Sequence, residues 1–284
     1  MIQVGTIKDI WRYPVKGMAG EQLESCVVAE QGLHGDRRWA LRDVRRAEIQ
    51  SCKARPQLLQ CAARCRADDA GQVEVSLPDG AVVDSDDATI HQRLATQSGH
   101  PSELVALRPA EELAFYRRYK REDGSWLDEL VATFDREAGE LLPDFLIDVP
   151  QNVADFVSAP GSFFLVTPLH LIATATLAHL RGANAQGDWD ARRFRPNFLI
   201  ETTAALSGLA EQAWLGKRLR LGAVEIDCVS TTPRCGAVTR AQPTLGVDKS
   251  ILRTIVRDAD QNLGIYGMTA TSGELRVGDS MQLL

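Results

Sequence analysis

Hydrophobic and polar residues alternate along several short stretches in the first part of the chain. This two-residue period is typical of β-strands with one buried face, and it predicts strands over residues 2–10, 22–30, 37–43 and 73–77. Apolar side chains also fall on alternate positions in 59–65. Turn signals rich in glycine, proline and aspartate separate these stretches. Short strands this close together predict an antiparallel meander or a small barrel.

Helical spacing of apolar residues replaces this alternation at two places. Residues 88–99 predict a helix of about 12 residues that Asp86 or Asp87 caps. Thr167-Pro168 predicts the start of a second helix, because a threonine can accept a backbone N–H at the cap and proline fits the first turn. The apolar stripe of this second helix consists of Leu169, Ile172, Leu177 and Leu180.

Short strands are predicted again in the second half of the chain. Phe163–Val166 and Phe198–Ile200 have the composition of strands, and 217–229 predicts two strands around Gly222. A last strand is predicted at Leu275–Val277. We therefore expect a mainly β protein with flanking helices, in the α+β class.

The length of 284 residues suits two modest domains. We predict a barrel-like domain over 1–95 and a second β-barrel domain over 160–284. The loop-rich region 96–159 is interpreted as a connector that lies over other structure. Because ligands often bind where domains meet, we expect the functional site in the cleft between the two domains.

Composition excludes several classes of protein. The net charge is −6, with 44% hydrophobic and 25% charged residues, which is ordinary for a soluble globular protein and argues against a general nucleic-acid binder. The N-terminus lacks an apolar signal core, and six cysteines are too few for a disulfide scaffold of this size. The most apolar stretch, 161–180, contains proline and histidines and is a poor membrane span. We therefore expect a cytoplasmic protein with free thiols and no membrane partner.

Cys235 is the first residue that suggests chemistry. Cys228 falls on the buried parity of the preceding strand and is interpreted as a small core residue. Cys235 follows in a turn between Pro233 and Gly236, beside Arg234. Positive charge favours the thiolate, which is the form that binds metals or attacks substrates. The alternative, a buried structural cysteine, is equally compatible with the spacing.

A group of polar residues in the sequence RRFRPNF is the second candidate. Pro196 biases Arg195 toward an extended conformation. In an extended chain Arg193, Arg195 and Asn197 share one face and could form a clamp for an oxyanion or a phosphate. The alternative is a solvated edge strand.

The third candidate for a functional site lies near the N-terminus and consists of Lys16 and the pair Asp36-Arg37. The segment 36–66 is locally basic, since it contains nine basic and three acidic residues. Such a segment suits an anionic ligand, although a scattered basic surface is the alternative. Cys61 and Cys65 lie too far apart on a strand to share one zinc ion, and no histidine partner for a cysteine hydrolase is recognisable.

The order of several motifs resembles the MOSC-domain proteins, whose name refers to the C-terminal domain of molybdenum cofactor sulfurase, with their N-terminal β-barrel domain. The layout is similar to that of the YcbX-like proteins and the amidoxime-reducing components. The motifs that carry the resemblance are IWRYPVKGM (10–18), GLHGDRRWAL (32–41), RRFRPNFLIE (192–201), WLGKRLRLG (214–222), TTPRCGAVTR (231–240) and VGDSMQLL (277–284).

The resemblance implies a molybdenum pterin cofactor rather than pyridoxal phosphate. Cys235 matches the position of the thiolate that binds the metal. The other residues that the resemblance and the clamp pattern assign to the cofactor are Lys16, Arg37, Arg193, Arg195, Asn197, Thr231 and Thr232. There are two departures from the family pattern, Gly17 in place of a serine and Pro233 two positions before the cysteine. They bear on the fine geometry and on the substrate, but not on the thiolate.

Two functions follow from this resemblance. The first is a molybdenum-dependent oxidoreductase that reduces N-hydroxylated or N-oxide small molecules. Because no cysteine-rich ferredoxin motif follows the last motif, its electrons would come from a separate protein. The second is a non-redox carrier, which would hold the cofactor or carry sulfur as a persulfide on Cys235.

Overall fold

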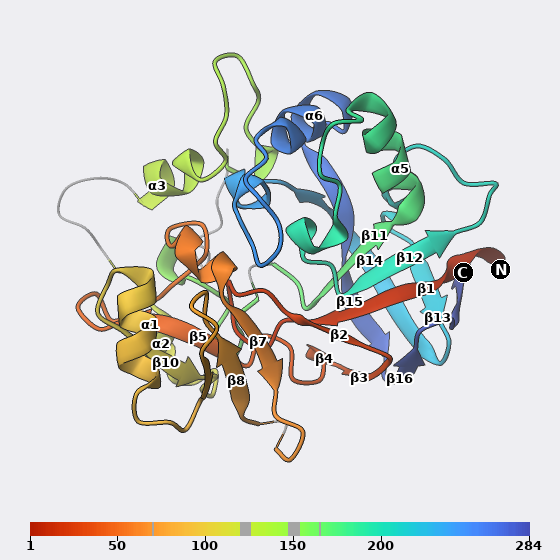
Figure 1. Cartoon of the computed structure of the whole chain (residues 1–284). Coiled ribbons are helices and arrows are strands. Elements are labelled where there is room, and N and C mark those ends of the chain that lie inside the picture. Colours follow the sequence, from red (N-terminus) through yellow and green to blue (C-terminus); the bar gives the residue numbers. More distant parts are fainter. Residues whose placement is uncertain (70, 120–125, 147–153, 165) are drawn as a thin grey trace.

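The computed structural model describes the whole chain except residues 70, 120–125, 147–153 and 165. Seven of the described strands close a barrel, which lies in the right half of the view in Figure 1. Around the barrel these are β1 (Ile2–Arg12), β12 (Phe198–Thr202), β11 (Leu169–Ala173), β15 (Asn262–Thr271), β14 (Val224–Pro233), β13 (Arg218–Leu221) and β17 (Ser280–Leu283). β2 (Glu21–Leu23) extends the sheet beside β1. The mainly β fold predicted from the sequence is therefore confirmed.

β1 closes the barrel although it comes from the opposite end of the chain. It pairs antiparallel with β12 on one side and with β17 on the other. Its apolar residues Val4, Ile7 and Ile10 are three positions apart rather than two, yet all are buried in the barrel core. Register shifts after Gln3 and after Ile7 explain this, because a bulge adds one residue and returns the next apolar side chain to the interior.

The N-terminal half forms small antiparallel sheets beside the barrel. The first contains β5 (Trp39–Asp43), β6 (Glu48–Ile49) and β10 (Ser102–Ala106), and the second contains β7 (Ala62–Cys65), β8 (Val73–Ser76) and β9 (Val82–Asp84). A third contains β3 (Ser25–Ala29), β4 (Gly32–Leu33) and β16 (Gly273–Arg276). α1 (Ile90–Ser98) and the 3-10 helix Pro56–Gln60 contribute Ile90, Leu94 and Leu58 to the core of this half.

Helices cover one side of the barrel. α5 (Thr174–Ala183) and α6 (Ser250–Asp258) lie next to each other there, and their apolar residues share one core with Ile172 of β11 (Figure 1). The connector contains α2 (Leu113–Tyr116), α3 (Trp126–Ala132) and the 3-10 helix Asp144–Leu146. None of the helices in the described part of the chain has both the length and the apolar character needed to cross a bilayer.

The prediction around Thr167-Pro168 is wrong. The described residues of Phe163–Val166 form no strand, and Leu169–Ala173 is strand β11 rather than the first turn of a helix, which starts at Thr174. Every residue of β11 is buried, because Leu171 faces the barrel core while Ile172 faces the helices. A strand buried on both faces has no alternation that distinguishes it from a buried helix.

Other predicted elements are in place with different ends. The predicted strand 22–30 is divided between β2 and β3, and the residue at the N-cap of α1 is Thr89 rather than Asp86 or Asp87. The strands around Gly222 are β13 and β14, although β14 continues to Pro233. β10 joins the N-terminal sheet from beyond residue 95, and the exact domain boundary stays a prediction.

Candidate functional site

A cavity of about 160 Å³ brings residues from both halves of the chain together. We call it the thiol cavity, after Cys235 in its wall. The predicted site residues that line it are Lys16, Arg37, Arg193, Arg195, Asn197 and Cys235. Thr231 and Thr232 are not among its lining residues.

Lys16 is a buried amine in the wall of the thiol cavity. Its backbone N–H donates to the carbonyl of Trp39, which fixes the segment before the amine, and its Nζ donates to the carbonyl of Phe163 at 2.7 Å. The side chain has no carboxylate partner among the described residues. Burial, together with the positive charges of Arg37, Lys53 and Arg195, lowers the pKa of Lys16 to about 7. An anion in the cavity would restore the protonated amine.

Arg37 and Arg195 lie at the ring of Tyr13. Their guanidinium carbons are 5.1 and 4.4 Å from the ring centroid. Arg37 pairs with Asp36, whereas Arg195 donates to the carbonyl of Met18 and pairs with no carboxylate in the described chain. Burial lowers the pKa of Arg195, because the charged form loses its hydration. The thiol cavity therefore contains positive charge that the protein itself does not neutralise.

The extended conformation predicted for Arg195 is wrong. Ala191–Phe194 is a 3-10 helix, and Arg195 follows it in the left-handed region with φ of 57°. The restriction imposed by Pro196 is overridden because Arg195 is the residue at which the helix ends. The turn, rather than strand alternation, brings the Arg195 side chain to the cavity.

Asn197 joins the two halves of the molecule. Its side-chain amide donates to Asp36 at 3.0 Å and to the carbonyl of Trp11 at 3.2 Å, and its oxygen accepts from the backbone N–H of His170. The side chain is completely buried. Both amide hydrogens are therefore used within the protein, and Asn197 holds the walls of the cavity together.

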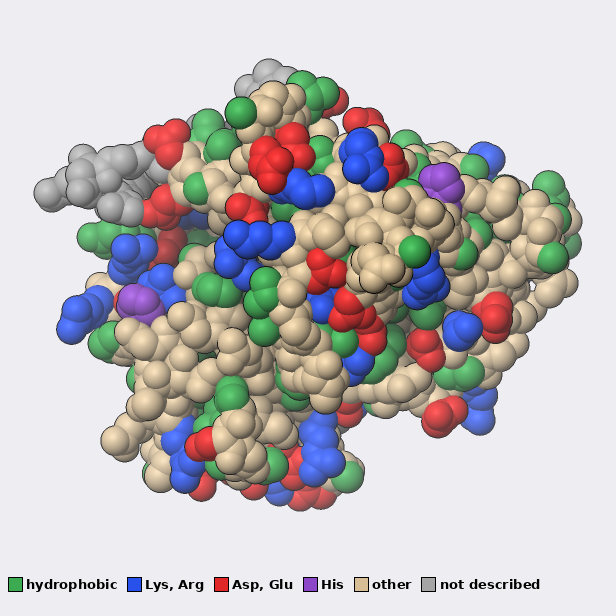
Figure 2. All heavy atoms as spheres, turned by 45° about the horizontal axis from the view of Figure 1, so that its top comes forward, with side chains coloured by type: hydrophobic (Ala, Val, Ile, Leu, Met, Phe, Trp, Pro, Cys, Tyr) green, Lys and Arg blue, Asp and Glu red, His purple; other side chains and the backbone are tan. Residues whose placement is uncertain are grey.

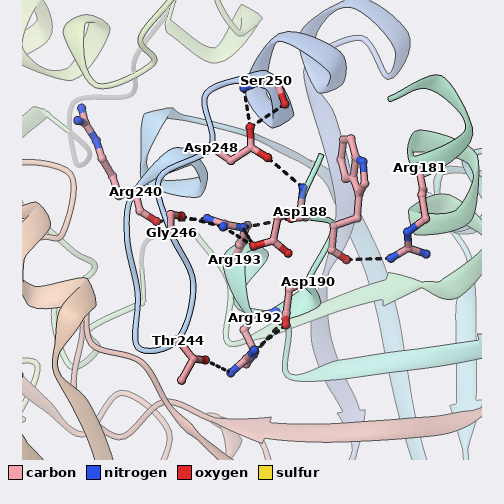
Figure 3. A network of polar contacts seen from close by, with 11 residues as sticks. Arg181, Asp188, Asp190, Arg192, Arg193, Arg240, Thr244, Gly246, Asp248 and Ser250 are labelled. Atoms are coloured by element: carbon pink, nitrogen blue, oxygen red, sulfur yellow. Dashed lines mark hydrogen bonds and ion pairs between the residues drawn. The ribbon is translucent and has the colours of Figure 1, made fainter. Parts of the chain in front are cut away.

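Arg193 is also engaged within the protein (Figure 3). Its guanidinium donates to the carboxylate of Asp188 at 2.5 Å, to the carbonyl of Gly246 at 2.8 Å and to the carbonyl of Arg240 at 3.3 Å. Asp188 donates in turn through its backbone N–H to Asp248. Arg193 thus fixes the loop that follows Cys235 in the chain.

Cys235 lies two residues after the end of β14, at the N-cap of the 3-10 helix Gly236–Thr239, and its side chain is partly exposed. The neighbouring Arg234 is buried and donates to the carbonyls of Leu263 and Phe194 and to Nε2 of His170. Burial and the charge of Arg234 hold the pKa of His170 well below its usual value, so the neutral imidazole accepts this hydrogen bond. Arg234 therefore anchors the loop that presents the thiol. Cys228, by contrast, lies in the barrel core as predicted.

Thr231 and Thr232 lie on β14, directly before its last residue, Pro233. Thr232 is completely buried, and its hydroxyl has no hydrogen-bond partner among the described residues. Thr231 is partly exposed and is opposite Ile265 of β15.

Several residues of the thiol cavity were not singled out by the sequence. Cys52 and Lys53 lie in its wall, and so do Phe163 and His170. The connector also reaches the loop that carries Cys235, since the carbonyl of Thr133 accepts from the backbone N–H of Gly236 at 2.8 Å. The basic character of 36–66 was a signal for Lys53, but no local pattern indicates that the connector packs here.

This set of groups fits an anionic cofactor that brings most of its own metal ligands. The described residues include no cluster of three or more histidine, cysteine, aspartate or glutamate side chains that could hold a metal ion. They do provide two partly exposed thiols, those of Cys52 and Cys235, beside Lys16 and Arg195, which have no carboxylate partner in that part of the chain. A thiolate is a soft ligand suited to such metals, and buried cations bind phosphate strongly.

Comparison with known proteins agrees with the motifs in the sequence. Residues 4–116 match the MOSC N-terminal beta barrel domain, and residues 162–282 match the MOSC domain. The human protein "Mitochondrial amidoxime-reducing component 1" is 23% identical to this chain over an aligned length of 302 residues, gaps included. The match covers 99% of this chain and 84% of that protein.

Two solved structures are also similar. The YUAD protein from Bacillus subtilis has a TM-score of 0.43 and 8% identity, over 99% of this chain and 95% of that one. The YiiM protein from Geobacillus stearothermophilus has a TM-score of 0.30 and 16% identity, over 41% of this chain and 54% of that one. The two domain matches together span both halves of the fold, and the chain therefore belongs to the family of MOSC-domain proteins with a MOSC N-terminal β-barrel domain.

Proposed function

We propose that this protein is a molybdenum cofactor-dependent oxidoreductase that reduces N-hydroxylated small molecules with electrons from a separate donor protein. The MOSC domain and the name of the human amidoxime-reducing relative support this proposal. In the overall reaction, an N–OH group takes up two electrons and two protons, the N–O bond breaks, and an N–H product and water leave.

The residues of the thiol cavity have separate roles in this proposal. Lys16, Arg37 and Arg195 hold the phosphate and the pterin through charge and donated hydrogen bonds. The thiolate of Cys235 binds the metal. Arg193 and Asn197 keep the walls of the cavity in position through the contacts given above. When bound, the molybdenum cofactor supplies two-electron redox chemistry, which protein side chains alone do not provide.

The observation that carries the proposal is the presence of the partly exposed thiol of Cys235 in the same cavity as the buried amine of Lys16. A buried cation without a counter-charge costs several kcal/mol, and a bound anion offsets that cost. The pKa of Lys16, lowered to about 7 by burial, is the direct sign of this cost.

The test compares two thiols in the same cavity. Cys235 and Cys52 both line the thiol cavity, but only Cys235 is proposed to bind the metal. The wild type, Cys235→Ser and Cys52→Ser are purified from a host that makes the cofactor. Molybdenum is measured by elemental analysis, and reduction of benzamidoxime is measured with chemically reduced viologen as electron donor.

We expect molybdenum and benzamidoxime reduction in the wild type, molybdenum in Cys52→Ser, and a loss of both metal and activity in Cys235→Ser. Equal molybdenum in all three proteins would contradict the ligand assignment. A wild type that contains no molybdenum but carries a persulfide on Cys235, detected by mass spectrometry, would instead support the sulfur carrier.

A further inference from the structure

A second, larger cavity adjoins the thiol cavity. Its volume is about 440 Å³, which lies in the range of small-molecule binding sites. Lys16, Ser51, Cys52, Lys53 and Ala237 line both cavities. We call the second one the basic cavity, because its wall also contains Arg46, Arg55, Arg118 and Arg240. A ligand in the basic cavity would therefore be in contact with the same segments that enclose Cys235.

The basic cavity has the opposite charge to the whole protein. Its lining residues in the described part of the chain include the lysines and arginines just named but only two carboxylates, those of Glu48 and Glu129, in a chain of net charge −6. Glu48 accepts from the backbone N–H of Tyr119 at 3.0 Å, and burial raises the pKa of its carboxyl group. The cavity thus concentrates a positive potential, which attracts anions.

Besides Lys16, three of these cations have no carboxylate partner in the described part of the chain. The Arg46 guanidinium lies 5.5 Å from the ring centroid of Tyr119, and the Lys53 ammonium lies 5.2 Å from that of Phe134. Arg240 uses its carbonyl, not its guanidinium, in the contact with Arg193, and its side chain extends away from that network (Figure 3). Arg55, in contrast, pairs with Asp43 at 3.7 Å.

Another part of the wall is apolar. Trp126 and Leu130 of α3 lie there together with Ile49 and Val157. The Trp126 ring is covered on one side by the guanidinium of Arg118, 4.7 Å from its centroid. A ligand that fits this cavity combines an apolar or aromatic body with an anionic group, since both kinds of wall are present.

We propose that the basic cavity binds the substrate and selects N-hydroxylated compounds that carry a carboxylate or phosphate group on an apolar body. This inference rests on the proposed function, because it assigns the substrate class to the cavity beside Cys235. Arg46 and Arg240 are the specificity-determining residues in it. Both line the basic cavity and not the thiol cavity, so they are independent of the residues proposed to hold the cofactor.

The experiment measures binding by titration calorimetry with two probes of similar shape. Benzamidoxime is neutral, and 4-carboxybenzamidoxime carries one negative charge. The proteins are the wild type and the Arg46→Gln/Arg240→Gln variant, each purified from the cofactor-producing host. The control variant is Lys217→Gln/Lys249→Gln, which removes the same charge at exposed positions outside both cavities. Thermal unfolding confirms that each variant is folded.

We expect the wild type to bind the carboxylated probe about tenfold more tightly than the neutral one at low salt, and this preference to decrease as salt screens the charges. Arg46→Gln/Arg240→Gln should reduce the preference to about twofold or less, with little change for the neutral probe. The control variant should keep the wild-type preference. Equal affinity of the wild type for both probes, or an equal loss in the control variant, would overturn the inference.

The two proposals fail in different ways. Binding does not require turnover, so a carboxylate preference that depends on Arg46 and Arg240, in a protein that reduces neither probe, would contradict only the proposed function. Reduction of both probes with the same KM and the same affinity would contradict only the substrate class.

Discussion

At the scale of single residues, the site is defined by positive charge that is buried without being neutralised. Lys16 donates only to a carbonyl, and Arg195 likewise donates to a carbonyl and to no carboxylate in the described chain. Backbone carbonyls satisfy hydrogen bonds but do not cancel a full charge. These two side chains are therefore placed for a ligand, whereas the buried Arg193 already has its carboxylate partner in Asp188.

Replacing Lys16 by methionine tests whether its amine is buried without a counter-charge. Burial lowers the pKa of Lys16 from 10.5 to about 7, so between these values the unfolded chain binds a proton that the folded, ligand-free protein does not bind. Stability rises with pH wherever the unfolded state binds more protons. The free energy of unfolding of the wild type, relative to Lys16→Met, should therefore increase between pH 7 and pH 10 by on the order of 2–4 kcal/mol. Urea unfolding of both ligand-free proteins measures this, and a difference that does not change with pH would show that the folded amine keeps its ordinary pKa.

At the scale of elements, alternation predicts a strand well where one face is polar. β8 and the pair β13–β14 agree with their patterns for this reason. β11 does not, because both of its faces are buried, and the turn that places Arg195 depends on how a short 3-10 helix ends. Such features depend on packing between distant parts of the chain, which a local pattern does not contain.

The pairing of β1 with β12 yields a prediction about barrel closure. A Cβ atom on Gly5 would lie 2.3 Å from the backbone carbonyl oxygen of Glu201 on β12. Because backbone cannot move aside cheaply, we expect Gly5→Ala to lower the free energy of unfolding by about 2–3 kcal/mol in urea titrations.

The matched control is Gly182→Ala in α5, where a Cβ atom meets nothing within 4 Å. Alanine is the better helix former, so this variant should gain about 0.5–1 kcal/mol. If both substitutions changed the free energy of unfolding equally, the close approach of β1 and β12 at Gly5 would not be the cause of the loss.

At the scale of the whole molecule, the two ends of the chain meet in one barrel (Figure 1). β1 comes from the start of the chain and β17 from its end, and β16 pairs with β3 in the other half. The halves therefore share strands, and their relative position, which forms the thiol cavity, is fixed by backbone pairing as well as by the Asn197–Asp36 hydrogen bond.

This arrangement predicts one cooperative unfolding transition for the whole chain. Scanning calorimetry and circular dichroism should give the same midpoint, because loss of β1 opens the barrel and separates the halves at once. Two transitions with separate midpoints would show that the halves are stable independently.

Only part of the site could be predicted from the sequence, because the position of a charged residue in the chain does not show which charges gather in space. Among the described residues on the face in Figure 2, acidic and basic side chains are intermingled. The sequence indicated a basic segment and, through its resemblance to the family, grouped Lys16, Arg37, Arg195 and Cys235. The structure brings these four residues to one cavity, while their role toward a cofactor stays a prediction. The basic cavity could not be predicted, because it forms only where 46–55 faces α3 of the connector.

The assignment of Cys235 as the metal ligand is tested most directly by the position of the metal in crystals of the cofactor-loaded protein. An anomalous difference map measured at the molybdenum absorption edge locates the metal without any assumption about the reaction. We expect one peak within bonding distance of Sγ of Cys235, with the phosphate of the cofactor against Lys16, Arg37 and Arg195. A peak bonded to Cys52 instead, or one outside the thiol cavity, would contradict the assignment.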